Sequence, residues 1–274
     1  MGLEIRTTSM KRLEAARLQK LSDSHHWSKP KYDQMLNFNS ADSLAFFQST
    51  CSPFKTAFET FSRTARNVAK DHFYLDNGWY GSVDAELLYS FVRARQPKRI
   101  IEIGSGFSTR LMSQAVAEGQ LQTRITSIDP APRVPLRCNF VEEIRTNVEY
   151  LDPKVIVDAL KQGDLLFVDS SHIAMTGGDV PYLFLEILPR LNAGVLIQIH
   201  DIFFPFEYPK EWVMAGWNWS EQYLVHAFLA YNPVFEIVWP ARYMWEYYRA
   251  EITTLVSVPT NVSTPSSLWL RKTT

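Results

Sequence analysis

The stretch RIIEIGSGFSTR, residues 99–110, restricts the fold of this chain more than any other segment. A β-branched apolar run ends in the carboxylate Glu102, and Gly104 and Gly106 follow with one residue between them. The run predicts a buried strand, and the glycines allow a tight turn into a helix at 107–119, which ends at a glycine. The segment therefore predicts a strand–turn–helix unit whose turn approaches a ligand closely.

The same alternation of strand and helix continues after this unit. Short apolar runs that read as strands alternate with amphipathic segments that read as helices, which is typical of a parallel sheet covered on both faces. Near the C-terminus two further strands are separated by an irregular stretch. The region 141–163 should hold one more strand and a helix, whose limits we do not assign. Beyond residue 119, the expected strands are 123–129, 164–169, 194–201, 235–240 and 266–272, and a helix is expected at 179–191.

Residues 1–72 lack strand alternation and contain helical patches at 11–21 and 54–70. We expect a helical N-terminal cap over 1–72 and the main domain over 73–274. Within the main domain, the irregular and aromatic-rich stretch 203–220 predicts a lid that shapes an apolar pocket. The N-terminal helices are a candidate surface for homo-oligomerisation.

Composition excludes several partner classes. The 274 residues carry a net charge of −1, so no bulk attraction to nucleic acid or to an anionic membrane is expected. No apolar run is long enough to span a bilayer, and the N-terminus lacks the apolar core of a secretory signal. Cys51 and Cys138 are the only cysteines, which favours a reduced, cytoplasmic setting.

Acidic residues stand at the ends of three predicted strands. Asp129 lies 129 − 106 = 23 residues after Gly106, close to the spacing at which an acid on the second strand binds both hydroxyls of a ribose. Asp169 is the last residue of the predicted strand at 164–169, as Asp129 is of the strand at 123–129. A dinucleotide fingerprint would need a third glycine where Thr109 stands, and Glu102 would repel a pyrophosphate. The carboxylate favours a cationic ligand, such as an ammonium or sulfonium group.

These residues make the sequence resemble the class I S-adenosylmethionine-dependent methyltransferases, and more closely the branch known as methyltransferase domain 24. The resemblance covers roughly residues 74–272 and is carried by RIIEIGSGFSTR, SIDP, GDLLFVDSSH, DVPYLFLEILPRLNAGVLIQIHDIF and FPFEYPKEW. It implies an α/β fold with a Rossmann-like, doubly wound, seven-stranded and mostly parallel sheet, in which one of the last two strands inserts antiparallel.

The resemblance also implies S-adenosylmethionine as the cofactor. Glu102 and the backbone at 104–106 would face its methionine part, Ser105 and Ser108 would bind its carboxylate, and Asp129 would hold the ribose. Contacts to the adenine are expected between Asn147 and Gly163. The implied cofactor-binding set is Glu102, Gly104, Ser105, Gly106, Ser108, Asp129 and Asp169.

The expected chemistry is in-line methyl transfer to a small-molecule acceptor, with a hydroxyl favoured over an amine or carbon. A hydroxyl nucleophile usually needs a base or a metal. His172 is the candidate general base, and His200 and Asp201 would orient the acceptor. Asp169, His200 and Asp201 could bind a divalent cation, but a histidine suits a hard-oxygen Mg²⁺ site poorly, so we expect a metal-free site.

Three alternatives remain open from the sequence. A nicotinamide-dependent oxidoreductase has the same sheet and an acid on its second strand, although Glu102 and Thr109 argue against it. A serine hydrolase could use Ser170 or Ser171 with His172, but no G-x-S-x-G elbow is present. A scaffold that binds the cofactor without transferring a methyl group is the third.

Overall fold

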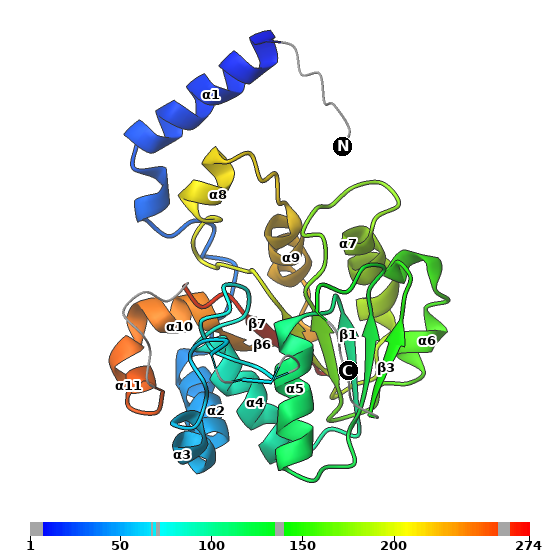
Figure 1. Cartoon of the computed structure of the whole chain (residues 1–274). Coiled ribbons are helices and arrows are strands. Elements are labelled where there is room, and N and C mark those ends of the chain that lie inside the picture. The colour runs from blue at the N-terminus through cyan, green and yellow to red at the C-terminus, as the bar shows by residue number, and fades with distance from the viewer. Residues whose placement is uncertain (1–7, 67, 70–71, 135–139, 257–263) are drawn as a thin grey trace.

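The computed structural model describes residues 8–66, 68–69, 72–134, 140–256 and 264–274. Its centre is a seven-stranded sheet in the order β3-β2-β1-β4-β5-β7-β6 (Figure 1). All neighbours pair in parallel except β7, which is antiparallel to both β5 and β6. The strands are β1 (Arg99–Ile103), β2 (Arg124–Ile128), β3 (Val141–Ile144), β4 (Leu165–Val168), β5 (Leu196–Ile199), β6 (Phe235–Pro240) and β7 (Leu268–Lys272).

This architecture confirms the predicted α/β, doubly wound sheet with one inverted strand. Strand order reverses between β1 and β4, because β2 and β3 lie on one side of β1 whereas β4 and β5 lie on the other. In open α/β sheets, ligands bind beyond the carboxyl ends of the strands at such a switch point. The loops after β1, β2, β4 and β5 are therefore the place to look for a site.

Helices cover both faces of the sheet (Figure 1). A separate cluster of buried apolar side chains lies on each side of it. One core packs α2 (Ser40–Cys51), α4 (Asp84–Arg95) and α5 (Phe107–Glu118) against the sheet, and the other packs α6, α7 and α9. The remaining elements are α1 (Thr8–Asp23), η1 (His26–Ser28), η2 (Ser52–Phe54), α3 (Lys55–Phe58), η3 (Val148–Tyr150), α6 (Lys154–Val157), α7 (Asp179–Tyr182), η4 (Leu183–Ile187), η5 (Leu188–Arg190), α8 (Lys210–Met214), α9 (Glu221–Ala230), α10 (Ala241–Tyr247) and α11 (Arg249–Thr253).

The N-terminal region has two parts that pack differently. In Figure 1, α1 projects away from the body of the protein, and α8 lies between α1 and the sheet. By contrast, α2 belongs to the main core, where Phe47 stacks on Trp239 of β6 with ring centroids 4.6 Å apart. Among the described residues of the patch at 54–70, only the first turn forms an α-helix, α3, and α2 was not anticipated. Cys51 is a buried free thiol, whereas Cys138 lies outside the described residues.

Among the described residues, no helix combines the length and apolar character needed to cross a lipid bilayer.

Candidate functional site

The turn after β1 is held by a buried carboxylate. Glu102 is fully buried and accepts hydrogen bonds from the hydroxyls of Ser108 (2.6 Å) and Thr109 (2.5 Å) at the start of α5. Burial raises the pKa of Glu102 to about 8, although these hydroxyl hydrogen bonds act in the opposite direction. Thr109 also accepts a hydrogen bond from the Gly106 amide, 3.0 Å away. Glu102 thus joins the strand to the helix that follows it.

Gly104 brings this turn against the tip of β4. Its φ is +92°, and a Cβ built on it would lie 2.1 Å from the carbonyl oxygen of Asp169. Any side chain would therefore collide with backbone and strain the turn. The absence of a side chain at Gly104 lets the loops after β1 and β4 share one cavity wall.

A cavity of about 500 Å³ lies beyond the ends of β1, β2 and β4. Four of the predicted cofactor-binding residues line it: Gly104, Ser105, Asp129 and Asp169. Asn147, Val148 and Glu149 also line it, at the start of the region predicted to contact adenine. Asp129 is half-buried, and its Oδ1 accepts a hydrogen bond from the Ala131 amide (2.7 Å). The cavity therefore gathers residues from three strand ends.

The other three predicted residues are not among the described residues that line this cavity. Glu102 and Ser108 are buried behind the turn and bind each other. Gly106 caps α5, with open space where a Cβ would lie. Their direct contact with a cofactor stays a prediction, whereas their contribution to the shape of the turn is visible.

A second cavity, of about 740 Å³, adjoins the first. The two share Arg133, Asp169, Ser170 and Ser171, so they meet at the tip of β4. The second cavity contains all three predicted catalytic residues. Its lining comprises Gly78, Trp79, Gly81, Ser82, Asp84, His172, Ile173, His200, Asp201, Phe203, Trp212, Gly216, Trp217, Asn218, Trp219, Thr264 and Ser266 together with the four shared residues.

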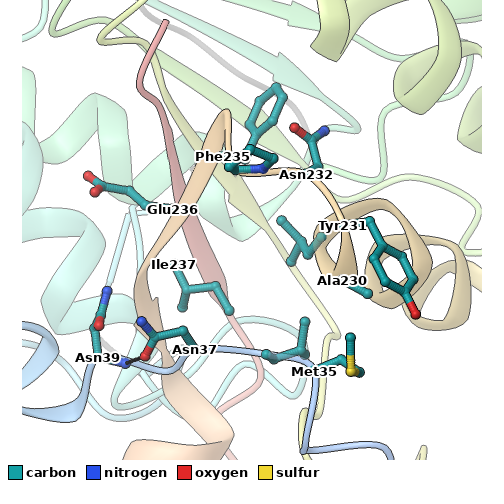
Figure 2. A pocket seen from close by; sticks show the side chains of 12 residues that line it. Met35, Asn37, Asn39, Ala230, Tyr231, Asn232, Phe235, Glu236 and Ile237 are labelled. Carbon is teal, nitrogen blue, oxygen red and sulfur yellow. Dashed lines mark hydrogen bonds between the residues drawn. The ribbon is translucent and has the colours of Figure 1, made fainter.

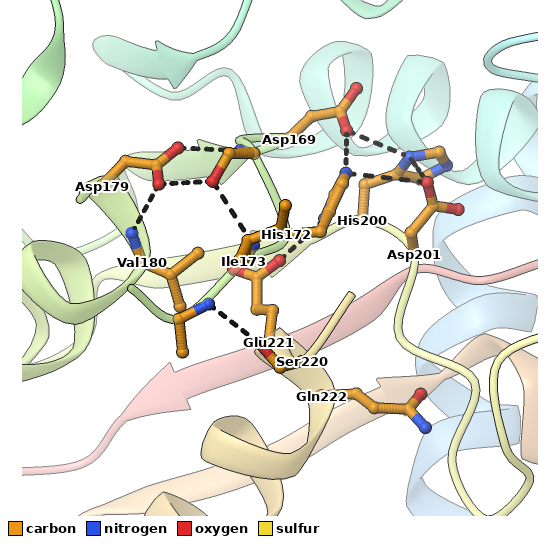
Figure 3. A network of polar contacts seen from close by, with 12 residues as sticks. Asp169, His172, Ile173, Asp179, Val180, His200, Asp201, Ser220, Glu221 and Gln222 are labelled. Atoms are coloured by element: carbon orange, nitrogen blue, oxygen red, sulfur yellow. Dashed lines mark hydrogen bonds and ion pairs between the residues drawn. The ribbon is translucent and has the colours of Figure 1, made fainter. Parts of the chain in front are cut away.

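The predicted catalytic residues converge with Asp169 (Figure 3). Asp169 Oδ1 lies 3.2 Å from His172 Nε2 and 3.5 Å from His200 Nδ1. Asp201 Oδ2 lies 3.8 Å and 3.6 Å from the same two nitrogens. Ser266, just before β7, donates a hydrogen bond to the other oxygen of Asp201 (2.9 Å). Two carboxylates thus face two imidazoles at the floor of the second cavity.

The charges of this cluster shift one another's pKa values. Burial lowers the pKa of His200, but the charges of Asp201 and Asp169 outweigh it and raise that pKa to about 9. Burial also acts to lower the pKa of His172. Hydrogen bonds to Asp169 and Glu221 outweigh this effect and raise the pKa well above its usual value. Burial acts to raise the pKa of Asp169, but the two histidines hold it well below its usual range. The protonation states of Asp169, His172 and His200 therefore depend on one another.

Glu221 is a site residue that sequence reasoning missed. It is fully buried at the start of α9, and its Oε2 lies 2.8 Å from His172 Nδ1. A carboxylate next to a run of aromatic residues was the available signal, because such a group is buried only when it has a partner.

The predicted lid, residues 203–220, forms an aromatic wall of the second cavity. The rings of Trp212, Trp217 and Trp219 lie within 5.0 to 5.1 Å of one another. Trp219 also lies 4.2 Å from the ring of His172. A flat apolar wall of this kind suits a small organic ligand.

A segment from the N-terminal region, residues 22–32, crosses the outside of this lid, and we call it the N-terminal strap. Trp27 Nε1 donates to the Tyr208 carbonyl (3.0 Å), and His26 Nε2 lies 3.1 Å from Glu207 Oε1. Lys210 donates to the hydroxyl of Ser22 (2.6 Å). Glu207 and Tyr208 of the lid thus bind the strap, and Tyr208 is buried.

A separate cavity of about 420 Å³ lies between β6, the end of α9 and the segment 35–39 (Figure 2). Its lining includes Asn37, Asn232 and Glu236 beside Met35 and Tyr231. It shares no lining residue with the two cavities at the strand ends. None of the predicted site residues lies in it.

Residues 101–202, from β1 to just after β5, match the family model of a methyltransferase domain, the branch that the sequence motifs resemble. The match confirms this resemblance over the segment that carries the cofactor-side motifs. The matched segment, 202 − 101 + 1 = 102 of the 274 residues, is similar to a methyltransferase domain, which favours this class over the oxidoreductase and hydrolase alternatives. No curated protein matches the chain.

Among solved structures, the chain is similar to the methyltransferase PaMTH1 of Podospora anserina bound to S-adenosylhomocysteine, with 15% identity over 100% of both chains and a TM-score of 0.43. CmcI D160 with Mg and S-adenosylmethionine has 11% identity over 71% of this chain and 73% of its own, with a TM-score of 0.40. MycE with Mg, S-adenosylhomocysteine and mycinamycin VI has 15% identity over 72% and 50%, with a TM-score of 0.39. At these values, nothing about the substrate of this chain follows from them.

Proposed function

We propose that the protein transfers a methyl group from S-adenosylmethionine to a hydroxyl group of a small organic acceptor. The observation that carries this proposal is the junction of two cavities at the tip of β4. The first cavity contains Asp129, an acid at the position where a ribose is expected to bind. The second cavity has an aromatic wall, and His172 lies beside that wall. A bound sulfonium cofactor supplies the electrophilic methyl group, so the chain must align and deprotonate the nucleophile.

The residues divide this work between the two cavities. Gly104, Ser105 and Asp129 hold the cofactor in the first cavity. The lid holds the acceptor in the second, with its hydroxyl toward Asp169. His172 Nε2, the nitrogen that faces the cluster, receives the hydroxyl proton; because Asp169 and Glu221 raise the pKa of His172, the ring is a strong base that acts once its own proton has been lost. Alignment of this kind contributes about 7–11 kcal/mol to lowering a barrier.

We also propose that Asp169, His200 and Asp201 bind a divalent cation, which reverses our expectation of a metal-free site. One atom of each lies within 4.8 Å of the other two. His200 Nδ1 is buried and has no hydrogen-bond partner among the described residues, although both carboxylates lie about 3.5 Å away. Ligand atoms around a metal with bonds of about 2.1 Å are separated by similar distances. The nitrogen ligand favours Zn²⁺, a borderline cation, over Mg²⁺, and Mn²⁺ should bind more weakly than Zn²⁺.

A first experiment measures the affinity for S-adenosylhomocysteine by calorimetry and then follows labelled methyl transfer to a panel of hydroxylated aromatic and sugar acceptors. H172N should lower kcat by about 10²–10⁴-fold because the proton acceptor is lost, and it should leave the affinity for S-adenosylhomocysteine unchanged. If H172N transferred methyl groups as fast as the wild type, the assigned role of His172 would be wrong.

A second experiment tests the cation. The chelator-treated protein is titrated with Mn²⁺, Zn²⁺ and Mg²⁺ in a calorimeter, and D201N is the comparison. We expect the wild type to bind one equivalent of Mn²⁺ or Zn²⁺ and D201N to bind either ion at least tenfold more weakly. Equal affinity of the two proteins would contradict this assignment of ligands.

A further inference from the structure

We propose that Arg133 binds an acidic group of the acceptor, so that the substrate of the second cavity is a hydroxylated compound that also carries a carboxylate. This inference rests on the proposed function, because it takes the second cavity as the place where the acceptor binds. Arg133 lies in the loop after β2 and lines both cavities where they meet. The methyl-transfer chemistry proposed above gives it no role.

The side chain of Arg133 carries an unpaired positive charge. Among the described residues that line either cavity, it is the only lysine or arginine, whereas both cavities contain aspartates. A cation–π contact with Trp79 is the only hydrogen bond, ion pair or ring contact that this side chain makes within the described part of the chain. The five N–H donors of the guanidinium group therefore have no acceptor there, and a ligand can supply one.

The contact with Trp79 holds the charge on the acceptor side. The guanidinium carbon of Arg133 lies 4.5 Å from the centre of the Trp79 ring. Trp79 lines the second cavity but not the first, so the charged end of Arg133 lies on the side of the acceptor and not of the cofactor. A guanidinium group over a ring keeps its donors in its own plane, where they can bind both oxygens of one carboxylate.

The turn that carries Trp79 is fixed by the side chain of Asn77. The Asn77 Oδ1 accepts hydrogen bonds from the amides of Trp79 and Tyr80, both at 2.8 Å. Its Nδ2 donates to the carbonyls of Tyr74 (2.7 Å) and Tyr80 (2.8 Å). The Trp79 side chain is nevertheless 60% exposed. A rigid backbone that presents an open ring beside a cavity indicates a contact for a ligand and not core packing.

The charge of the lining favours a carboxylate over a phosphate. One arginine balances the single charge of a carboxylate, whereas a phosphate monoester carries about −1.5 to −2 near neutral pH and would stay partly uncompensated. His172 and Arg133 line the same cavity, so one acceptor can present its hydroxyl to the first and its carboxylate to the second. Binding of the carboxylate would then orient the hydroxyl for transfer.

The test compares acids with their amides, because the amide keeps the shape of the acid without its charge. The probes are 4-hydroxybenzoate, 3,4-dihydroxybenzoate and glucuronate, each with its amide, together with 4-hydroxyphenyl phosphate. Calorimetry at pH 7 measures their binding to the protein saturated with S-adenosylhomocysteine. For at least one pair, we expect the wild type to bind the acid about 10–100-fold more tightly than the amide, which is the range for hydrogen bonds to a charged group.

Three variants assign this preference to Arg133. R133M keeps an unbranched side chain against Trp79 but lacks the charge, so the acid and the amide should bind within threefold of each other. R133K keeps the charge without the planar fork and should give an intermediate ratio. R124M is the matched control, because Arg124 is exposed at the start of β2 and lines neither cavity, and it should keep the wild-type ratio.

Several results would overturn the proposal. One is a ratio in R133M equal to that of the wild type, and another is no tighter binding of the acid in any pair. A loss of more than tenfold in the affinity of R133M for S-adenosylhomocysteine would assign Arg133 to the cofactor, and tighter binding of 4-hydroxyphenyl phosphate than of every acid would refute the choice of a carboxylate.

This binding test is separate from the test of methyl transfer. If the wild type bound the acids through Arg133 but transferred no methyl group to any acceptor, the role of Arg133 would stand and the proposed function would fail. If it methylated the amides as fast as the acids, the proposed function would stand and the role of Arg133 would fail.

Discussion

The two cavities that meet at Asp169 are built in different ways. The first is formed by turns at the ends of β1, β2 and β4, which are adjacent strands in the sheet. The second is closed by the lid, and the N-terminal strap binds the lid from outside, so elements nearly two hundred residues apart in the sequence form one wall. The sheet register fixes the first cavity, whereas side-chain contacts between remote loops fix the second.

This difference predicts that damage to the turn at the ends of the strands has the largest effect. G104A places a Cβ against the Asp169 carbonyl at a positive φ, so the turn must move. We expect affinity for S-adenosylhomocysteine to fall by more than about 10²-fold in calorimetry, together with a loss of stability of about 1–3 kcal/mol. G106A is the comparison for packing within the protein, because a Cβ there meets no protein atom within 4 Å, so G106A should keep the wild-type stability. Equal losses in the two variants would show that close packing against β4 is not what the turn requires.

The buried carboxylate beneath that turn should give the protein a stability that depends on pH. The pKa of Glu102 is raised by burial to about 8, compared with a usual value near 4.5, so the folded state binds its proton more tightly than the unfolded state. The free energy of unfolding is therefore expected to fall as pH rises from about 4.5 to about 8, by about 3–5 kcal/mol, and to be flat above that interval.

E102Q removes this titration, and urea unfolding at several pH values compares it with the wild type. The difference between the two curves isolates Glu102 from all other groups. A constant difference across the interval would mean that Glu102 is ionised in both states, and that its charge is balanced within the fold.

A smaller effect is expected at Asp129, which faces the first cavity without supporting the fold. D129A should weaken binding of S-adenosylhomocysteine by about 10–100-fold, which corresponds to the loss of hydrogen bonds to a charged group. D152A is the matched control, because Asp152 makes the same bond to an amide two residues ahead but lines neither cavity. If both variants bound the nucleoside like the wild type, the ribose would have to bind elsewhere.

The smallest effect should come from the strap, and it should be confined to the second cavity. W27A removes the hydrogen bond to the Tyr208 carbonyl and loosens the lid, so the acceptor KM should rise by about 3–10-fold. Affinity for S-adenosylhomocysteine should stay within twofold of the wild type. Hydrogen exchange of residues 203–220 should also become faster. Weakened binding of S-adenosylhomocysteine in W27A would show that the two cavities are not independent in the way that their construction suggests.

The sequence allowed prediction of the first cavity because its information is local. A strand, its glycines and its terminal acid are consecutive, and Asp129 lies at a fixed spacing from Gly106. The sheet with its inverted strand, and the convergence of Asp169 with His200 and Asp201, followed from the rule that parallel strands end at one edge. The structure agrees on these elements and adds the lining residues.

The second cavity could not be predicted in the same detail, because its geometry depends on contacts between remote segments. The aromatic residues beside Glu221 indicate that its carboxylate has a partner, but they do not identify His172 as that partner. Nothing near Trp27 in the sequence indicates that it binds Tyr208. The helix α2 was missed because its moderately apolar sequence lacks a clear stripe, and it becomes stable only by packing on α4 and β6. The positions of Glu221, Trp27 and α2 therefore depend on tertiary packing and not on local sequence.

The inverted strand has a consequence for the timing of assembly. Because β7 is antiparallel to β5, it begins at the edge of the sheet where β5 ends, and this brings Ser266 to the floor of the second cavity. Ser266 there binds Asp201, and the amides of Ser266 and Ser267 bind the buried Asp84. During translation, every other component of the floor leaves the ribosome before β7. The floor of the second cavity is therefore completed only when β7 has been made and has inserted between β5 and β6.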